Sequence, residues 1–229
     1  MNLIDSNLLY LMLMILSVAY PLINSFESKI HFATKWKALF PSIGIMMLVF
    51  IPWDIWFTYL GVWSFSENFI IGYKVLYLPI EEWLFFIFIP FCCVFIHEVL
   101  QYYFPINKLY FSSKIILFFA VILFFTSFLF FDKLYTFCVS FITAILMLTI
   151  YFQKRFFVNN LLRTYLVSLV PFLLINGILT GSFNSPVVLY NSGEIVNIRL
   201  LNIPLEDFFY CFSMLVLTIL PYSYFKKQL

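Results

Sequence analysis

The sequence predicts an all-α membrane protein with seven transmembrane helices, and three observations support this fold class. Hydrophobic residues make up 64% of the chain and charged residues only 10%, whereas soluble domains are about half apolar and a quarter charged. Apolar runs long enough to cross a bilayer recur along the chain, and its second half repeats features of the first. A soluble fold is excluded because 32 Phe and 15 Tyr would leave large apolar patches in water.

Each apolar run is expected to form one membrane-spanning helix, which takes about 20 residues. The predicted helices cover 7–23, 38–59, 80–104, 114–131, 134–152, 162–180 and 203–222. The first run has no basic residues before it, so we expect a retained span and not a cleaved signal peptide. The connections between runs are polar, basic or contain proline, and the two longest are 61–79 and 181–202.

The basic residues predict the orientation of the helices, because cytoplasmic connections carry an excess of Lys and Arg. One side carries only Lys74, Lys133 and Arg199. The other side carries ten basic residues: Lys29, Lys35, Lys37, Lys108, Lys114, Lys154, Arg155, Arg163, Lys226 and Lys227. We therefore expect a multi-pass protein of the cell membrane with its N-terminus outside and its C-terminus in the cytoplasm.

Two short motifs place paired carboxylates where apolar helices are expected to begin. They read LPIEEW at 78–83 and IPLEDF at 203–208, and they hold Glu81 with Glu82 and Glu206 with Asp207. Only 11 acidic residues occur in the whole chain. Ionisable side chains in or beside a membrane are costly and mark function by default, although acids in a first helical turn can also serve as caps.

The similarity between the two halves extends beyond these motifs. Lys74 precedes its motif by the same distance as Arg199, and Asp54-x-x-x-Thr58 is matched by Asn176-x-x-x-Thr180. We expect a first repeat at 1–105 (helices one to three), a connector helix at 106–132 and a second repeat at 133–229 (helices five to seven). One connecting span makes the two three-helix repeats parallel, so both carboxylate pairs would meet at one depth.

The paired acids favour acid–base chemistry in an apolar cavity. Burial away from water and a second carboxylate nearby both favour the neutral form of a carboxylic acid, which can then donate a proton. Adjacent helical residues point about 100° apart, since a turn takes about 3.6 residues. One acid of each pair can thus face the cavity while its neighbour contacts a supporting group.

Other residues are candidates for supporting the acids or contacting the substrate. Asp54 and Asn176 are intramembrane polar residues on the same side, either supporting the acids or bonding between helices. Lys74 and Arg199 would keep carboxylates ionised or lie at the membrane interface. Aromatic faces attract cations, and those next to the acids are Trp83, Phe208 and Tyr210.

Some polar residues carry less information. His97 and Glu98 lie toward the cytoplasmic end of the third expected helix, as interfacial anchors or a proton relay. Cys92, Cys93 and Cys138 lack disulfide or metal spacing and are expected to pack as small apolar residues, as is Cys211. We expect no metal site.

Four segments together resemble the integral-membrane lycopene cyclase family, in the form that fuses two small subunits into one chain. They are GVWSF at 61–65, GYKVLYLPIEEWLFFIFIPF at 72–91, NGILTGSF at 176–183 and IRLLNIPLEDFFYCF at 198–212. The resemblance implies a lycopene β-cyclase, an intramolecular lyase or isomerase that closes the ψ ends of lycopene to β-rings, giving γ-carotene and then β-carotene. It also implies that Glu81, Glu82, Glu206 and Asp207 carry the acid chemistry through carbocation intermediates.

The expected partners are lycopene from the lipid phase and membrane lipids, with possible association with other carotenoid enzymes and no nucleic acid. No cofactor is expected, since the chain has six glycines and no GxGxxG motif for flavin or nicotinamide. A retinal protein is disfavoured because 203–222 contains no lysine. A carotenoid hydratase, a cyclase of C50 or hydroxylated carotenoids, and a polyene or lipid transporter stay open as alternatives.

Overall fold

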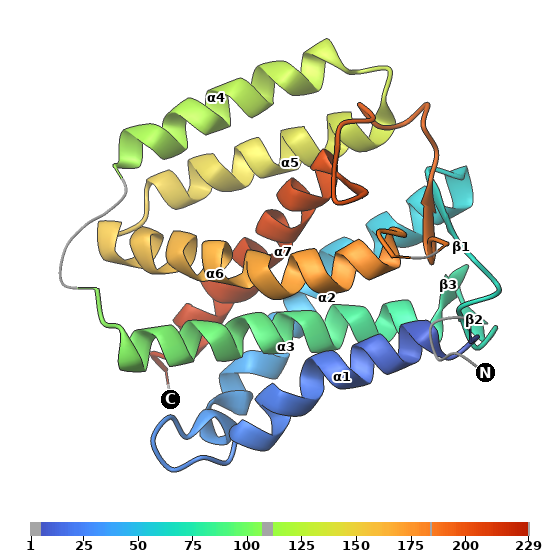
Figure 1. Cartoon of the computed structure of the whole chain (residues 1–229). Helices are drawn as coiled ribbons and strands as arrows, with labels where there is room; N and C mark the ends of the chain where they lie inside the picture. Colours follow the sequence, from blue (N-terminus) through green and yellow to red (C-terminus); the bar gives the residue numbers. More distant parts are fainter. Residues whose placement is uncertain (1–5, 107–111, 184, 229) are drawn as a thin grey trace.

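The computed structural model describes residues 6–106, 112–183 and 185–228. Over these ranges the chain forms a bundle of seven α-helices with a short 3₁₀ helix, Phe32–Lys35, before the second of them (Figure 1). The helices are α1 (Leu9–Asn24), α2 (Trp36–Leu60), α3 (Ile80–Tyr103), α4 (Ser113–Leu129), α5 (Leu134–Tyr151), α6 (Arg155–Leu179) and α7 (Leu205–Phe225). Lys108, which was counted in the charge bias, lies outside the described residues.

The seven predicted helices are present, and five of them are long and apolar enough to cross a membrane: α2, α3, α5, α6 and α7. The two others are shorter, with 16 residues in α1 and 17 in α4, against the roughly 20 that span the hydrocarbon core. Length alone therefore supports five spans, and the crossing of the membrane by α1 and α4 stays a prediction.

The structure also contains short strands, which an all-α prediction did not include. They lie in the two long connections: β1 (Trp63–Phe65), β2 (Lys74–Val75) and β3 (Leu78–Pro79) in the first, β4 (Val188–Tyr190), β5 (Arg199–Leu200) and β6 (Ile203–Pro204) in the second. They pair antiparallel as β1–β4, β2–β3 and β5–β6. Segments of two or three residues carry too little alternation to be recognised as strands in a sequence.

The β1–β4 ladder joins the two halves of the chain about a pseudo-twofold axis. Trp63 lies opposite Tyr190 and Phe65 opposite Val188, and each member has its counterpart 125 residues away. The flanking bonds obey the same symmetry: Ser66 N–H donates to the Val187 carbonyl (2.8 Å) and Asn191 N–H to the Val62 carbonyl (2.9 Å). The two repeats are therefore held face to face at the end of the bundle where α3 and α7 begin.

Tight hairpins set the start of α3 and of α7. β2–β3 turns through Leu76 and Tyr77, which have φ of 51° and 71°, and β5–β6 turns through Leu201 and Asn202 at 49° and 64°. A two-residue turn with positive φ at both positions is of type I′, which normally takes Asn, Asp or Gly there. The same costly geometry recurs in both repeats, directly before the two carboxylate motifs.

Candidate active site

The first acid of each motif holds the preceding loop. Glu81 Oε1 accepts a hydrogen bond from the Ile71 backbone N–H at 2.7 Å, and Glu206 Oε1 accepts one from the Val196 N–H at 2.7 Å. Both carboxyl groups are buried, and neither lines the cavity described below. Glu81 and Glu206 thus tie the long connections to the first turns of α3 and α7.

The second acid of each motif accepts a hydrogen bond from a buried tyrosine. Tyr10 Oη donates to Glu82 Oε2 at 2.6 Å, and Tyr135 Oη donates to Asp207 Oδ1 at 2.7 Å. The tyrosines open α1 and α5, the first helices of the two repeats. Each pair spans 72 residues of chain, so the two Tyr–carboxylate pairs are counterparts in the repeat.

The two pairs differ in the donors around them. Asp207 Oδ2 also accepts from Asn176 Nδ2 and from Tyr190 Oη, both at 2.8 Å. Burial raises the pKa of Tyr190, which lies in β4, well above its ordinary value, and its hydroxyl therefore keeps the proton that it donates. Asp207 thus has three donors, which match the lone pairs of an ionised carboxylate.

Glu82 has fewer donors because its neighbours differ in kind. The counterpart of Tyr190 in the first repeat is Phe65, which has no hydroxyl, and the counterpart of Asn176 is Asp54, which is itself an acid. Asp54 Oδ1 accepts from Trp63 Nε1 at 2.7 Å, and its Oδ2 is buried without a partner among the described residues. The first repeat therefore carries two carboxyl groups where the second carries one carboxyl and one amide.

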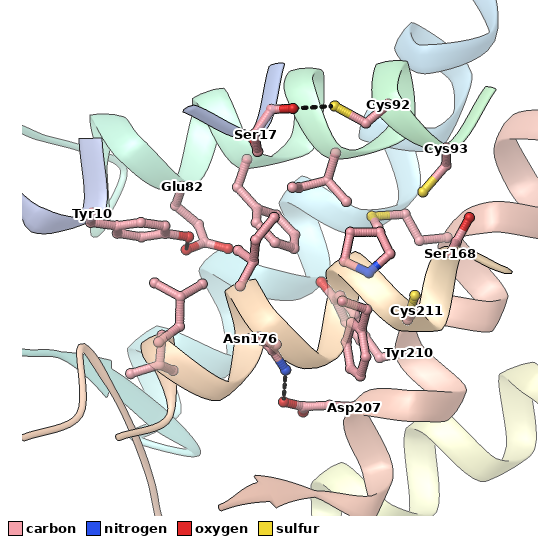
Figure 2. Close-up of a pocket in the computed structure, with 18 of the residues that line it drawn as sticks. Tyr10, Ser17, Glu82, Cys92, Cys93, Ser168, Asn176, Asp207, Tyr210 and Cys211 are labelled. Atoms are coloured by element: carbon pink, nitrogen blue, oxygen red, sulfur yellow. Dashed lines mark hydrogen bonds between the residues drawn. The ribbon is translucent and has the colours of Figure 1, made fainter. Parts of the chain in front are cut away.

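All three carboxyl groups line one cavity of about 320 Å³ between the repeats, and Figure 2 shows Glu82 and Asp207 at this cavity. Glu82, Asp54 and Asp207 meet there, although they come from α3, α2 and α7. The rest of the lining is dominated by aliphatic, aromatic and cysteine side chains, and the described lining residues include no Lys, Arg or His. Several anions without a cation are very unfavourable in a dry cavity, so this arrangement requires neutral carboxylic acid among them.

Aromatic rings enclose the acid end of the cavity. Tyr210 lies at their centre, with ring centroids 4.7 Å from Phe50, 5.2 Å from Trp53 and 6.3 Å from Trp63. Its hydroxyl is buried without a partner among the described residues. Of these rings, Tyr210 and Trp63 line the cavity, and Phe50 and Trp53 pack behind Tyr210. The π-faces of aromatic rings stabilise a cation without reacting with it as an alkoxide or amine would.

Besides Glu81 and Glu206, four predicted site residues lie outside the cavity lining: Lys74, Arg199, Trp83 and Phe208. Lys74 forms an ion pair with Glu67, and Arg199 donates to the Asn202 carbonyl at 2.9 Å. The prediction that these two cations keep the motif acids ionised is corrected accordingly, because each lies in a β-hairpin strand with an exposed side chain. The alternative, that both lie at the membrane interface, stays a prediction. The contacts described for Lys74 and Arg199 therefore do not include an ion pair with a carboxylate of the two motifs.

Trp83 and Phe208 follow the acids in sequence but turn away from the cavity, because one helical step rotates a side chain by about 100°. Trp83 Nε1 donates to the Val75 carbonyl at 3.3 Å, and Phe208 packs against Phe172 with ring centroids 5.1 Å apart. Neither lines the cavity. Of the three aromatic residues Trp83, Phe208 and Tyr210, Tyr210 lines the cavity.

His97 and Glu98 lie at the other end of α3, far along the helix from the motif acids. Glu98 is buried and accepts from Lys226 Nζ, Lys35 Nζ and Tyr222 Oη. His97 is buried between Thr164 and Gln101. These contacts join α3 to α6, to α7 with its C-cap Lys226, and to the 3₁₀ helix that ends at Lys35. His97 and Glu98 thus form a clamp between helices and are more deeply buried than an interfacial anchor, and the proton-relay alternative stays a prediction.

Sequence reasoning missed several residues of the site. Tyr10, Tyr135, Tyr190 and Phe65 were not singled out, and Tyr190 and Phe65 come from connections whose strands were not foreseen. A signal was present: Tyr10 and Tyr135 are separated by the same 125 residues as Glu82 and Asp207. Extending the repeat outward from the motifs to every matching polar residue would have found this pair.

Comparison with known proteins identifies the family. A sequence profile described as Lycopene cyclase matches the chain twice, at residues 7–100 and 132–225. These two matches correspond to the two repeats and leave α4 between them. Comparisons with curated proteins and with solved structures give no match. Because the matched regions cover most of the 229 residues, the chain belongs to the lycopene cyclase family, in a form that carries both matching regions in one polypeptide.

Proposed function

We propose that the protein is a lycopene β-cyclase, which converts the ψ ends of lycopene to β-rings, forming γ-carotene and then β-carotene, without net oxidation or reduction. The observation that carries this proposal is the apolar cavity in which Glu82, Asp54 and Asp207 meet, with no Lys, Arg or His among the lining residues that the structure describes. A hydrocarbon has no group for a charged site to bind. It needs an apolar chamber, a proton donor and a counter-ion.

Glu82 is the proposed proton donor. It accepts one hydrogen bond, from Tyr10, and shares the cavity with Asp54, a second carboxyl group. Like charges in one dry site do not both ionise readily, so one of the two retains a proton. Glu82 transfers that proton to the terminal double bond of the ψ end. The tertiary carbocation so formed is attacked by the next alkene, which closes the six-membered ring.

Asp207 is the proposed counter-ion. Its three donors, Tyr135, Tyr190 and Asn176, match an ionised carboxylate, which stabilises the ring cation across the cavity. The ring cation then loses a proton from the ring carbon that carries the polyene chain. A carboxylate of the site accepts it, and return of a proton to Glu82 completes a cycle in which protons taken up and released balance.

The resemblance of the chain to the family implies that Glu81 and Glu206 are catalytic. We propose instead that they hold the loops that precede α3 and α7. Each fixes a backbone N–H and so positions the neighbouring acid. Glu82 and Asp207 are therefore the proposed catalytic residues. Asp54 adds a second carboxyl group beside Glu82, and Asn176 donates a hydrogen bond to Asp207.

The test is expression in a lycopene-accumulating host, with pigment chromatography and mass spectrometry. We expect γ-carotene and β-carotene, and in deuterated medium each ring should gain one solvent deuteron, because ring closure starts with a proton from an exchangeable acid. Hydroxylated products would indicate a hydratase instead. Unchanged lycopene in cells that contain inserted protein would contradict the proposal and favour transport.

We also propose that all seven helices cross the cell membrane, with the motif ends of α3 and α7 outside. Short spans such as α1 and α4 are accommodated by local thinning of the bilayer. A cysteine placed at Asn191, an exposed loop residue, should react with a membrane-impermeant maleimide added to intact cells. Reaction only after lysis would reverse the orientation.

A further inference from the structure

The cavity at the acids continues along one side of the bundle. A second cavity, of about 470 Å³, lies between the far ends of α1 and α3 and shares Tyr20, Phe95 and Ile96 with the first. Together the two run from Glu82 to Tyr103, a rise of about 32 Å along α3 at about 1.5 Å per residue. This matches the thickness of the hydrocarbon core, about 30 Å.

The channel follows α1, α3 and α6, and small residues keep that side open. Ser17, Cys92 and Ser168 come from these three helices and line the cavity; Figure 2 shows them beyond Glu82, where the Cys92 thiol donates to the Ser17 carbonyl. They lie in the middle of their helices, where a larger side chain would fill the space between α1, α3 and α6.

Across the pseudo-twofold axis the corresponding positions hold larger side chains. Ser17 and Cys92 correspond to Ile142 and Leu217 at the spacing of 125 residues, and Ser168 corresponds to Met46 when α6 is aligned on α2 through Asn176 and Asp54. Met46 is fully buried, and the other two pack against the core. The side lined by α2, α5 and α7 is thus filled where the other side is hollow.

We infer that the α1–α3–α6 channel is the binding site for the unreacted tail of the polyene, and that the enzyme therefore closes one end of its substrate per binding event. This inference rests on the proposed cyclase function. With one tail channel for one acid chamber, the second cyclisation requires the product to leave and re-enter reversed. The tail that then occupies the channel carries a β-ring, which is broader than an open ψ end.

The test is to narrow the channel and measure the ratio of monocyclic to bicyclic product. Cys92→Leu and Ser168→Met introduce the side chains found across the axis. Each should raise the ratio of γ-carotene to β-carotene by about tenfold or more, since overpacking penalises the broader occupant most. Cys138→Leu is the matched control, because Cys138 lies on α5 outside the channel lining, and it should leave the ratio at the wild-type value.

An unchanged ratio in both channel variants would overturn the inference, whatever the total yield. If a variant forms no ring, the amount of lycopene that co-purifies with the monodisperse protein in detergent is measured. Loss of the bound lycopene supports the channel, and the same amount as in the wild type contradicts it. Failure of the wild-type protein to form rings would instead refute the proposed function, so the two failures are distinguishable.

Discussion

Tyr190 donates a hydrogen bond of 2.8 Å to Asp207, whereas Phe65, its counterpart in the first repeat, offers no donor to Glu82. The repeat thus supplies two carboxylates at equivalent positions and then makes their surroundings unequal. A proton-initiated cyclisation needs this inequality, because one group must give up a proton while another stays an anion. Two residues outside the acidic motifs, Phe65 and Asp54, generate the difference on the Glu82 side.

Replacing the proposed donor should abolish ring closure. We expect Glu82→Gln to reduce ring formation by about 10²-fold or more, the usual contribution of a general acid, because an amide cannot protonate an alkene. Pigment chromatography from lycopene-accumulating cells measures it, with Glu67→Gln as the control, since Glu67 is exposed and pairs with Lys74. Wild-type levels of β-carotene from Glu82→Gln would eliminate this residue as the donor.

Glu81 should behave differently from its neighbour. Gln at position 81 can still accept from the Ile71 N–H, so Glu81→Gln should lower the free energy of unfolding by about 1 kcal/mol through loss of a charge-assisted bond. Ring formation per folded molecule should fall far less than in Glu82→Gln. Thermal unfolding in detergent, run beside the activity assay, separates the two effects; equal losses of activity at unchanged stability would assign chemistry to Glu81.

A single hydroxyl should make the Glu82 side resemble the Asp207 side. Phe65→Tyr introduces the donor that Tyr190 supplies in the second repeat, and a hydrogen bond to the ionised form of a carboxyl group favours that form. An ionised Glu82 cannot donate a proton, so we expect slower ring formation. Phe65→Leu tests the alternative that any change of the ring is harmful, and greater activity in Phe65→Tyr than in wild type would contradict the division of roles.

The clamp at the far end of α3 should contribute to stability and not to chemistry. Glu98→Gln leaves Lys35 and Lys226 without their buried anion. The loss in unfolding free energy is expected to be about 1–3 kcal/mol, less than for a fully buried pair because both lysines are partly exposed. Activity per folded molecule should stay near wild type, and a specific loss of turnover in a fully stable variant would argue for a relay role.

Ring closure should proceed without a redox cofactor. Proton uptake and release balance in the proposed reaction, so membranes washed free of flavin and nicotinamide should still convert lycopene at an undiminished rate. The measurement compares washed membranes with and without added reduced cofactor. A strict requirement for the reduced form would show that the mechanism is incomplete.

Much of this protein is determined by local sequence. The apolar runs predict seven helices because each run must satisfy its backbone groups internally in lipid, and the paired acids predict a site because charge is costly there. The recurrence of the Pro-x-Glu-acidic motif in both halves also predicts that the two halves meet. These inferences need only composition, spacing and the physics of a bilayer.

Tertiary structure alone decided which acids share the cavity and what surrounds each of them. Glu81 and Glu82 are adjacent and chemically identical in sequence, and only the direction of each side chain from α3 separates a loop contact from a cavity wall. Tyr135 and Tyr190 reach Asp207 because α5 and β4 converge on α7, across 72 and 17 residues of chain. Packing between helices sets the direction of each side chain and brings distant segments together. A local sequence pattern does not contain this information.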